Sequence, residues 1–293
     1  MKRSRLMTDY SAYILILPNV LIYAVFILLP AFATVGLSFT DYNIFRMNFL
    51  GLRNYVRLFS DELFLRSVVN TLYYTVGTIV PSMAIGLLVA IGLNTGVRWR
   101  GAFRLIIFLP HVLSVVAVSL AWLYLYNPSA GVLNQILGQI GLPGQEWLRD
   151  PVTAMPSLMV MQIWNGLGYS MVVYLAGLQT IPAYLYEVAM IDGAGPLRRF
   201  SYITIPMLAP TTFFLFVTGV IFSFQVFGQV YIMTQGGPLH RTTTIVHQIY
   251  YRGFEGYRMG YASAMAVMLL LATVAVTLVN IRVGKSKGAT DVA

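Results

Sequence analysis

One apolar stretch of the chain, MQIWNGLGYS at 161–170, is interrupted by residues that could bind a small polar ligand. Gln162, Asn165, Gly166 and Tyr169 follow the three- and four-residue spacing that puts side chains on one face of a helix. Amides both donate and accept hydrogen bonds, and an aromatic ring can stack on the C–H face of a sugar. This face therefore predicts a wall that contacts a neutral, hydroxyl-rich ligand. Ordinary packing between helices is the alternative explanation.

A second apolar stretch repeats this combination of amides and rings. Its sequence from Phe222 to Gln229 is FSFQVFGQ, and its two glutamines lie among aromatic side chains. Polar groups in so apolar a setting must face other protein groups or a ligand, because lipid offers them no partner. Phe222, Ser223 and Gln225 are therefore candidate ligand contacts.

Motifs for chemistry on a substrate are missing from the sequence. Gly284-Lys285-Ser286 matches the end of a phosphate-binding loop, but Val279 stands where that loop requires a glycine. The sequence has no H-E-x-x-H, no G-x-S-x-G and no cysteine, and its apolar runs hold no carboxylate. We therefore predict that the chain is not an enzyme, with no catalytic residue and no metal site.

The elements that must carry these residues are membrane helices. The chain is 58% hydrophobic and only 10% charged. A helix needs about 20 apolar residues to cross a bilayer, and only a helix or a closed barrel satisfies its backbone there. The sequence predicts an all-α membrane protein with a tail at 1–11, a transmembrane domain at 12–283 and a tail at 284–293. The uncharged runs that predict its six helices are 12–38, 68–93, 105–126, 155–178, 207–232 and 261–281.

The basic residues predict the orientation of these helices. The net charge of +9 does not indicate nucleic-acid binding, because the charges are dispersed among the loops. With six spans, both termini and the second and fourth loops share one side, which carries 11 of the 19 Lys and Arg residues. The positive-inside rule makes that side cytoplasmic. Both termini and the loop at 179–206 are therefore expected in the cytoplasm.

This cytoplasmic loop has a helical pattern of its own. Pro182 suits the first position of a helix and Gly193 the position after its end, so 182–192 predicts a short helix. A second helix is expected from Pro196 through Thr204, ending before Pro206. The first helix carries several apolar residues outside the bilayer, which need a protein surface or lipid headgroups to cover them.

The segment EVAMIDGAGPLRRFSYITIP at 187–206 resembles the cytoplasmic "EAA" loop of ABC-importer permeases. Val188 stands where that family usually has alanine. The resemblance implies that the loop docks onto a separate ATPase subunit, which binds ATP and Mg, while this chain binds no cofactor. The residues implied to couple the two subunits are Glu187, Val188, Ala189, Asp192, Gly193, Ala194, Gly195, Pro196, Phe200 and Pro206.

Other motifs resemble the carbohydrate permeases of the maltose type. They include Gly51-Leu52-Arg53-Asn54-Tyr55 and Gly236-Gly237-Pro238, and the resemblance extends over 50–283. It implies the ABC type I importer fold, with partners that are a second permease subunit, two ATP-binding subunits and an extracytoplasmic solute-binding protein. The sugar contacts that it implies are Gln162, Gly166, Tyr169, Gly219, Phe222, Ser223 and Val226.

The expected function is therefore that of a permease subunit in an ATP-driven importer of a carbohydrate, in the cytoplasmic membrane. A permease for sn-glycerol 3-phosphate or a related polyol phosphate is a close alternative. An anionic ligand would need a basic side chain near the pathway, and no Lys or Arg lies within the six runs. An ion-coupled secondary transporter is the alternative of a different class, although such proteins usually have ionisable residues within the membrane.

Overall fold

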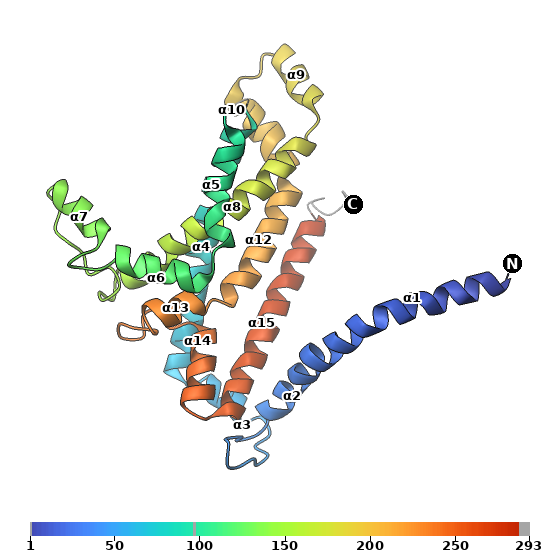
Figure 1. The fold of residues 1–293 in the computed structure, drawn as a ribbon, viewed down its shortest axis with the longest axis vertical. Coiled ribbons are helices and arrows are strands. Elements are labelled where there is room, and N and C mark those ends of the chain that lie inside the picture. The colour runs from blue at the N-terminus through green and yellow to red at the C-terminus, as the bar shows by residue number, and fades with distance from the viewer. Residues whose placement is uncertain (1, 96–97, 287–293) are drawn as a thin grey trace. The chain divides into compact units, whose positions relative to one another are not determined.

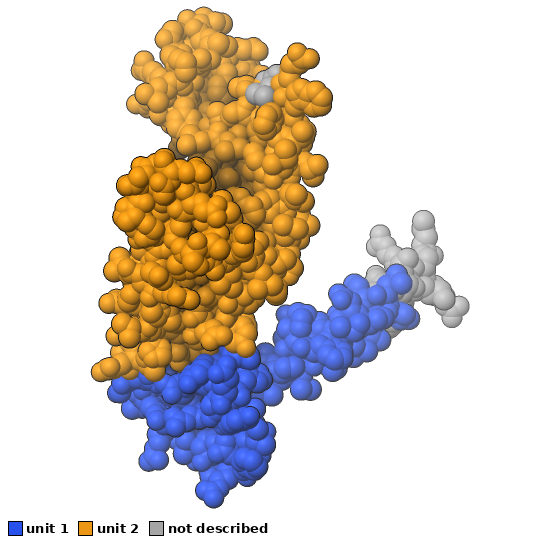
Figure 2. Space-filling view, turned by 60° about the vertical axis from the view of Figure 1, so that its left-hand side comes forward, with its two compact units in different colours: residues 1–61, 249–270 blue, residues 62–248, 271–293 orange. Residues whose placement is uncertain are grey.

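The computed structural model describes residues 2–95 and 98–286, so the end of the predicted C-terminal tail lies outside the described residues. The chain divides into two compact units, shown in different colours in Figure 2. Unit 1 consists of Met1–Asp61 and Ile249–Leu270, and unit 2 of Glu62–Gln248 and Leu271–Ala293.

Among the described residues the regular structure is helical, with only isolated bridges in the loop after α2. Figure 1 shows the elements in chain order from blue to red. They are α1 (Lys2–Tyr23), the π-helical turn η1 (Ala24–Leu28), α2 (Leu29–Ser38), α3 (Arg53–Leu58), α4 (Glu62–Asn94), α5 (Arg100–Val112), α6 (Val115–Leu125), α7 (Val132–Gln139), α8 (Ala154–Thr180), α9 (Ala183–Ile191), α10 (Pro196–Arg199), η2 (Phe200–Thr204), α11 (Ile205–Met207), α12 (Ala209–Phe224), α13 (Gly228–Met233), α14 (Ile245–Tyr250), η3 (Tyr251–Glu255) and α15 (Met259–Ser286).

The expected all-α membrane architecture is confirmed. By length and apolar composition, 4 helical segments in the described chain could cross a membrane, or up to 6 if each of two bent helix pairs forms one span. The unbent segments are Tyr13–Ser38, Glu62–Asn94, Ala154–Thr180 and Met259–Asn280. The first helix begins at Lys2, within the stretch predicted as a tail.

The third predicted span is not one straight helix. Helices α5 and α6 meet at an angle of 99°. Leu113 leaves the helical conformation with ψ 147°, and Ser114 starts the next helix by accepting a hydrogen bond from the Val116 backbone N–H at 3.3 Å. A serine at this position satisfies a backbone donor that the first turn of a helix leaves free. The break therefore follows from a helix cap inside an apolar run.

The second bent pair leads from the predicted cytoplasmic loop into the fifth span. The segment Pro196–Met207 and helix α12 meet at 61°. Pro210 lacks a backbone N–H, and its ring is incompatible with a carbonyl four residues earlier in a regular helix, which accounts for the bend at Leu208. The prediction that the helix ends before Pro206 is wrong. The π-helical turn η2 ends at Thr204, and α11 continues the helix through this proline as far as Met207.

Helix α8 is central to unit 2, where it contacts α4, α5 and α12. Glycines allow two of these contacts. A Cβ at Gly168 would lie 2.4 Å from the Ile107 carbonyl oxygen of α5, and one at Gly86 would lie 2.6 Å from the Ser170 Cβ. Small residues at such crossings let helix backbones approach closely. By allowing these close approaches, the two glycines let α8 and its polar face pack directly against α4 and α5.

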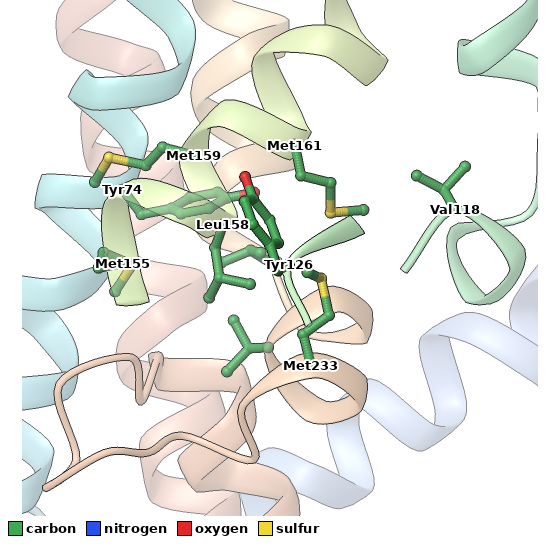
Figure 3. Packing of buried hydrophobic residues seen from close by; sticks show 10 residues of the cluster. Tyr74, Val118, Tyr126, Met155, Leu158, Met159, Met161 and Met233 are labelled. Atoms are coloured by element: carbon green, nitrogen blue, oxygen red, sulfur yellow. The ribbon is translucent and has the colours of Figure 1, made fainter. Parts of the chain in front are cut away.

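Ten buried residues of unit 2 form a methionine-rich cluster (Figure 3). It joins α4, α6, α8 and α13, and its members include Tyr74, Tyr126, Met161 and Met233. The Tyr126 hydroxyl donates to the Ser157 carbonyl at 2.9 Å. This cluster fixes α13 against the first half of α8.

In unit 1, the loop after the first span is tied to the short helix α3. Asn54 is buried, and its side-chain amide donates to the carbonyls of Ser38 and Thr40 at 2.9 and 2.7 Å. These carbonyls lie at the end of α2, where a helix lacks internal donors. Asp61 accepts a hydrogen bond from the Tyr261 hydroxyl at 2.8 Å, which connects the loop to the first turn of α15.

Candidate functional site

Unit 2 contains a cavity of about 390 Å³, which we call the central cavity. Residues of α4, α5, α8 and α12 line it. Six residues predicted from the sequence are among them. Gln162, Gly166 and Tyr169 come from α8, and Gly219, Phe222 and Ser223 from α12. The structure therefore brings together two sequence stretches that are about 50 residues apart and that each show an amide or hydroxyl beside aromatic rings.

Three other predicted contacts do not line the central cavity. The Asn165 side-chain amide donates to the Pro110 carbonyl at 2.8 Å. This carbonyl lies at the end of α5, where the break leaves acceptors without helical partners, so Asn165 stabilises the break. Val226 is 5% exposed and belongs to the methionine-rich cluster. Gln225 is exposed. Helix α12 ends at Phe224, so Gln225 does not continue the face of this helix that lines the cavity.

Sequence reasoning missed the wall that α4 contributes. Thr78 and Ser82 line the central cavity, and they continue a series of hydroxyl residues that begins at Thr71 and Thr75. Their spacing of four and three residues puts them on one helix face. Threonine hydroxyls in helices can donate to the carbonyl four residues earlier, as Thr78 does to Tyr74 at 2.8 Å. This spacing of hydroxyl residues is the feature of the sequence from which the wall could have been predicted.

His111 was also not predicted from the sequence as a residue that lines the cavity. It follows Pro110 near the end of α5 and lines the central cavity. Its ring stacks on that of Tyr169, with centroids 5.2 Å apart and planes inclined by 26°. One face of each ring is covered by the other, and the outer face of the stacked pair gives a partly polar platform of the kind on which a sugar ring can lie.

The central cavity offers hydrogen-bonding groups without charge. Within the described residues, no Asp, Glu, Lys or Arg lines it. In that same part of the chain, the hydroxyls of Ser82, Tyr169 and Ser223 make no hydrogen bond to protein atoms. The Gln162 side-chain oxygen accepts a hydrogen bond from the Gln229 amide at 3.1 Å, which leaves the Gln162 NH₂ group for a ligand. Such a lining suits a neutral molecule with several oxygen atoms.

Unit 2 also carries the predicted cytoplasmic helix, α9. Pro182 is its N-cap, with extended backbone angles, and not its first helical residue. At the other end Gly193 has φ 77°, as predicted for the position after a helix. The Gly193 N–H bonds to the Met190 carbonyl at 3.1 Å, and the Ala194 N–H to the Ala189 carbonyl at 2.8 Å. This pair of hydrogen bonds defines a Schellman motif.

The sequence matches a known family over most of its length. Residues 82–285 match the family described as "Binding-protein-dependent transport system inner membrane component". The chain belongs to this family. Two similar proteins are the probable ABC transporter permease protein YurN of Bacillus subtilis and the sn-glycerol-3-phosphate transport system permease protein UgpA of Agrobacterium fabrum. YurN is 36% identical over 280 residues, covering 94% of this chain and 96% of YurN. UgpA is 34% identical over 273 residues, covering 92% and 93%.

Solved structures of such inner membrane components have the same fold. A chain of the bacterial alginate ABC transporter, in complex with an alginate pentasaccharide-bound periplasmic protein, superposes with a TM-score of 0.86 at 27% identity. The match covers 97% of this chain and 96% of that one. The MetNI methionine ABC transporter gives a TM-score of 0.54 at 16% identity over 77% of this chain and 96% of that one, which shows the shared fold alone.

The inner membrane component exposes an apolar surface on α9 and the turn after it. Val188 is 52% exposed, Ile191 85% and Leu197 77%. Glu187 and Asp192 are exposed beside them, and Ala189 and Phe200 are half-buried. Apart from Ile191 and Leu197, these residues belong to the predicted coupling set. That set also includes Gly195, Pro196 and Pro206, all three exposed. A hydrogen bond of 3.0 Å between the Tyr186 and Thr204 hydroxyls ties α9 to η2.

Proposed function

We propose that this chain is the permease subunit of an ATP-driven importer of a carbohydrate, and that the central cavity is its half of the translocation pathway. The observation that carries the proposal is the lining of the cavity, which combines stacked rings with unused hydrogen-bonding groups and no charged side chain. Sugars present both C–H faces and hydroxyls, so this lining matches them.

The open side of the central cavity supports a second permease subunit as partner. Phe222 lines the cavity and is 70% exposed. Lipid offers no partner to the Ser223 hydroxyl beside it, so another protein or a ligand is expected to cover this side of the cavity. In the proposed complex a related subunit closes this side, and a solute-binding protein delivers the sugar from outside the cell. Both termini lie in the cytoplasm, as the distribution of basic residues favours.

The exposed surface of α9 supports docking onto an ATPase. In the proposed complex two ATP-binding subunits hold ATP and Mg, and their closure moves α9. The segment from Pro196 to Met207 continues from the α9 region to the start of α12, which lines the central cavity. A displacement of α9 would thereby change the position of α12 without any chemistry on this chain. Each state of the pathway would be favoured by different partner contacts, as any ligand-driven shift requires.

Uptake by the complete importer in proteoliposomes tests the transport proposal. The probes are radiolabelled glucose, maltose, trehalose and sn-glycerol 3-phosphate, with ATP enclosed on the ATPase side. ATP-dependent uptake of a sugar is the expected result. Preferred uptake of glycerol 3-phosphate would favour the alternative suggested by the similarity to UgpA. Uptake that needs an ion gradient, and not ATP, would overturn the proposal.

Two variants test the docking of α9. Gly193→Asp introduces a side chain at a left-handed position, and Glu187→Lys reverses a charge on the exposed surface. Both should reduce the ATPase that co-purifies with the permease while leaving membrane insertion intact. A normal ratio of subunits together with normal uptake would show that α9 is not the docking site.

A further inference from the structure

Gln229 connects the central cavity to the methionine-rich cluster. It lies in α13, is 7% exposed and does not itself line the cavity. Its side-chain nitrogen donates to the Tyr74 hydroxyl at 2.7 Å and to the Gln162 side-chain oxygen at 3.1 Å. One buried amide therefore holds together α13, α4 and the polar face of α8.

The position of Gln229 is fixed by its surroundings. The next residue, Val230, is fully buried in the methionine-rich cluster, and Tyr74 is 1% exposed. A Cβ at Gly228, on the other side, would lie 3.0 Å from Val115. Because α13 is packed so closely, the Gln229 amide has little freedom to move, and it acts as a rigid partner for Gln162.

The bond to Gln229 decides which end of the Gln162 amide faces the cavity. The terminal torsion of a free glutamine is broad and roughly two-fold, so either its oxygen or its nitrogen could face a ligand. Here the oxygen is bound to Gln229. The nitrogen lies toward Gly166, where an added Cβ would be 3.8 Å from it. Gly166 lines the central cavity, so the group presented there is a donor.

We propose that Gln229 is a positioning residue of the transport pathway, which turns the NH₂ group of Gln162 toward the ligand. The ligand must then offer an acceptor oxygen at this point, which a hydroxyl, a ring oxygen or a glycosidic oxygen can do. This inference rests on the proposed function, because it concerns the same cavity.

A double-mutant cycle on the complete importer tests the inference. The probe is the sugar with the highest ATP-dependent uptake among glucose, maltose and trehalose. Gln229→Leu should raise the KM for uptake about tenfold, the effect expected of one misplaced hydrogen bond, with Vmax changed less than about twofold. In a Gln162→Ala background the same substitution should change KM by less than about twofold, because Gln229 acts through Gln162.

Gln248→Leu is the matched control. Gln248 is 3% exposed, and its amide donates to the Thr243 hydroxyl at 2.9 Å, away from the central cavity. The substitution removes a buried hydrogen bond of the same kind, so it should lower thermal stability and leave KM unchanged. An equal rise of KM in the Gln248 variant, or additive effects of the Gln229 and Gln162 substitutions, would overturn the inference.

Gln229→Glu gives a readout that a purely structural role would not change. The ionised carboxylate only accepts, so Gln162 would donate to it and turn its own oxygen toward the ligand. Because burial favours the neutral acid, uptake by this variant is measured at the highest pH that the complex tolerates. The probe is a singly O-methylated sugar that inhibits uptake by the wild type. In the variant, this sugar should be at least about tenfold weaker as an inhibitor than its unmethylated parent. If the two sugars inhibit the variant in the same ratio as the wild type, the inference is contradicted and the proposed function is not affected. Absence of ATP-dependent sugar uptake by the wild type would overturn the proposed function, and this inference with it.

Discussion

Unit 2 contains two cavities of nearly equal size that differ in what their polar groups do. The central cavity measures about 390 Å³, and a second one measures about 380 Å³. We call the second one the loop pocket, because the ends of α6 and α13 and the loops beside them line it. Its polar residues include Asn127, Arg149 and Thr234.

In the loop pocket most polar groups already have partners in the protein. The Thr234 hydroxyl donates to the Val230 carbonyl at 3.0 Å and accepts from the Thr242 hydroxyl at 2.7 Å. The Asn127 side-chain oxygen accepts from the backbone N–H groups of Ser129 and Ala130 at 3.0 and 2.9 Å. In the central cavity the hydroxyls of Ser82, Tyr169 and Ser223 bond to no protein atom of the described residues. Unused hydrogen-bonding groups, more than volume, therefore distinguish the proposed ligand site from the loop pocket.

Filling the central cavity should have the largest effect. A Cβ at Gly166 would make only ordinary contacts, 3.7 Å from Ser82 Oγ and 3.8 Å from Gln162 Nε2, so Gly166→Leu should fold. Its side chain would occupy the cavity and reduce uptake in proteoliposomes by about a hundredfold or more, since a steric clash with the ligand costs several kcal/mol. Uptake above one tenth of the wild-type rate would show that the ligand passes elsewhere.

Removing one ring from the platform should have the next largest effect. Tyr169→Ala takes away the ring that stacks on His111 and lines the central cavity. We expect a rise of about tenfold in the KM for uptake, because an aromatic contact contributes about 1 kcal/mol beyond its buried area. Phe222→Ala should behave similarly. Normal KM in both variants, with normal assembly of the complex, would contradict the site.

A substitution beside the loop pocket should affect stability and not transport. Thr242 is fully buried, and its hydroxyl bonds to Thr234 and, at 2.6 Å, to the Gly237 carbonyl. Thr242→Val would remove both hydrogen bonds, leave the Gly237 carbonyl without this donor and destabilise the fold by about 1–3 kcal/mol. The expected measurement is a lower thermal inactivation temperature of the purified complex with unchanged KM. A raised KM without loss of stability would assign a ligand to the loop pocket.

The smallest effect is expected at the rim of the loop pocket. Arg149 is paired with Glu146 at 3.9 Å, and both side chains are largely exposed. An exposed pair of this kind contributes about 0–1 kcal/mol, so Arg149→Ala should change uptake less than about twofold. A tenfold loss for glycerol 3-phosphate but not for a sugar would make this arginine an anion contact.

The sequence was sufficient for the features that depend on composition or on local geometry. Uncharged runs predicted the spans, and Gly193 predicted the end of α9. The bend after α5 was missed because a capping serine inside an apolar run gives no change in hydropathy. The sequence predicted Asn165 as a ligand contact because it shares a helix face with Gln162 and Tyr169. Its side chain instead binds the Pro110 carbonyl, which belongs to another helix. Gln229 could not be preferred over Gln225, since only the fold shows which amide is buried.

The Schellman motif at the end of α9 affects which substitutions the exposed surface of this helix can accept. Its hydrogen bonds join backbone groups only, and its geometry depends on the backbone of Gly193. The exposed side chains of Val188 and Ile191 take no part in it. Substitutions on this surface can therefore accumulate without altering the end of the helix. In the proposed complex, a transporter lineage could in this way adapt to a different ATPase subunit while it keeps the same pathway.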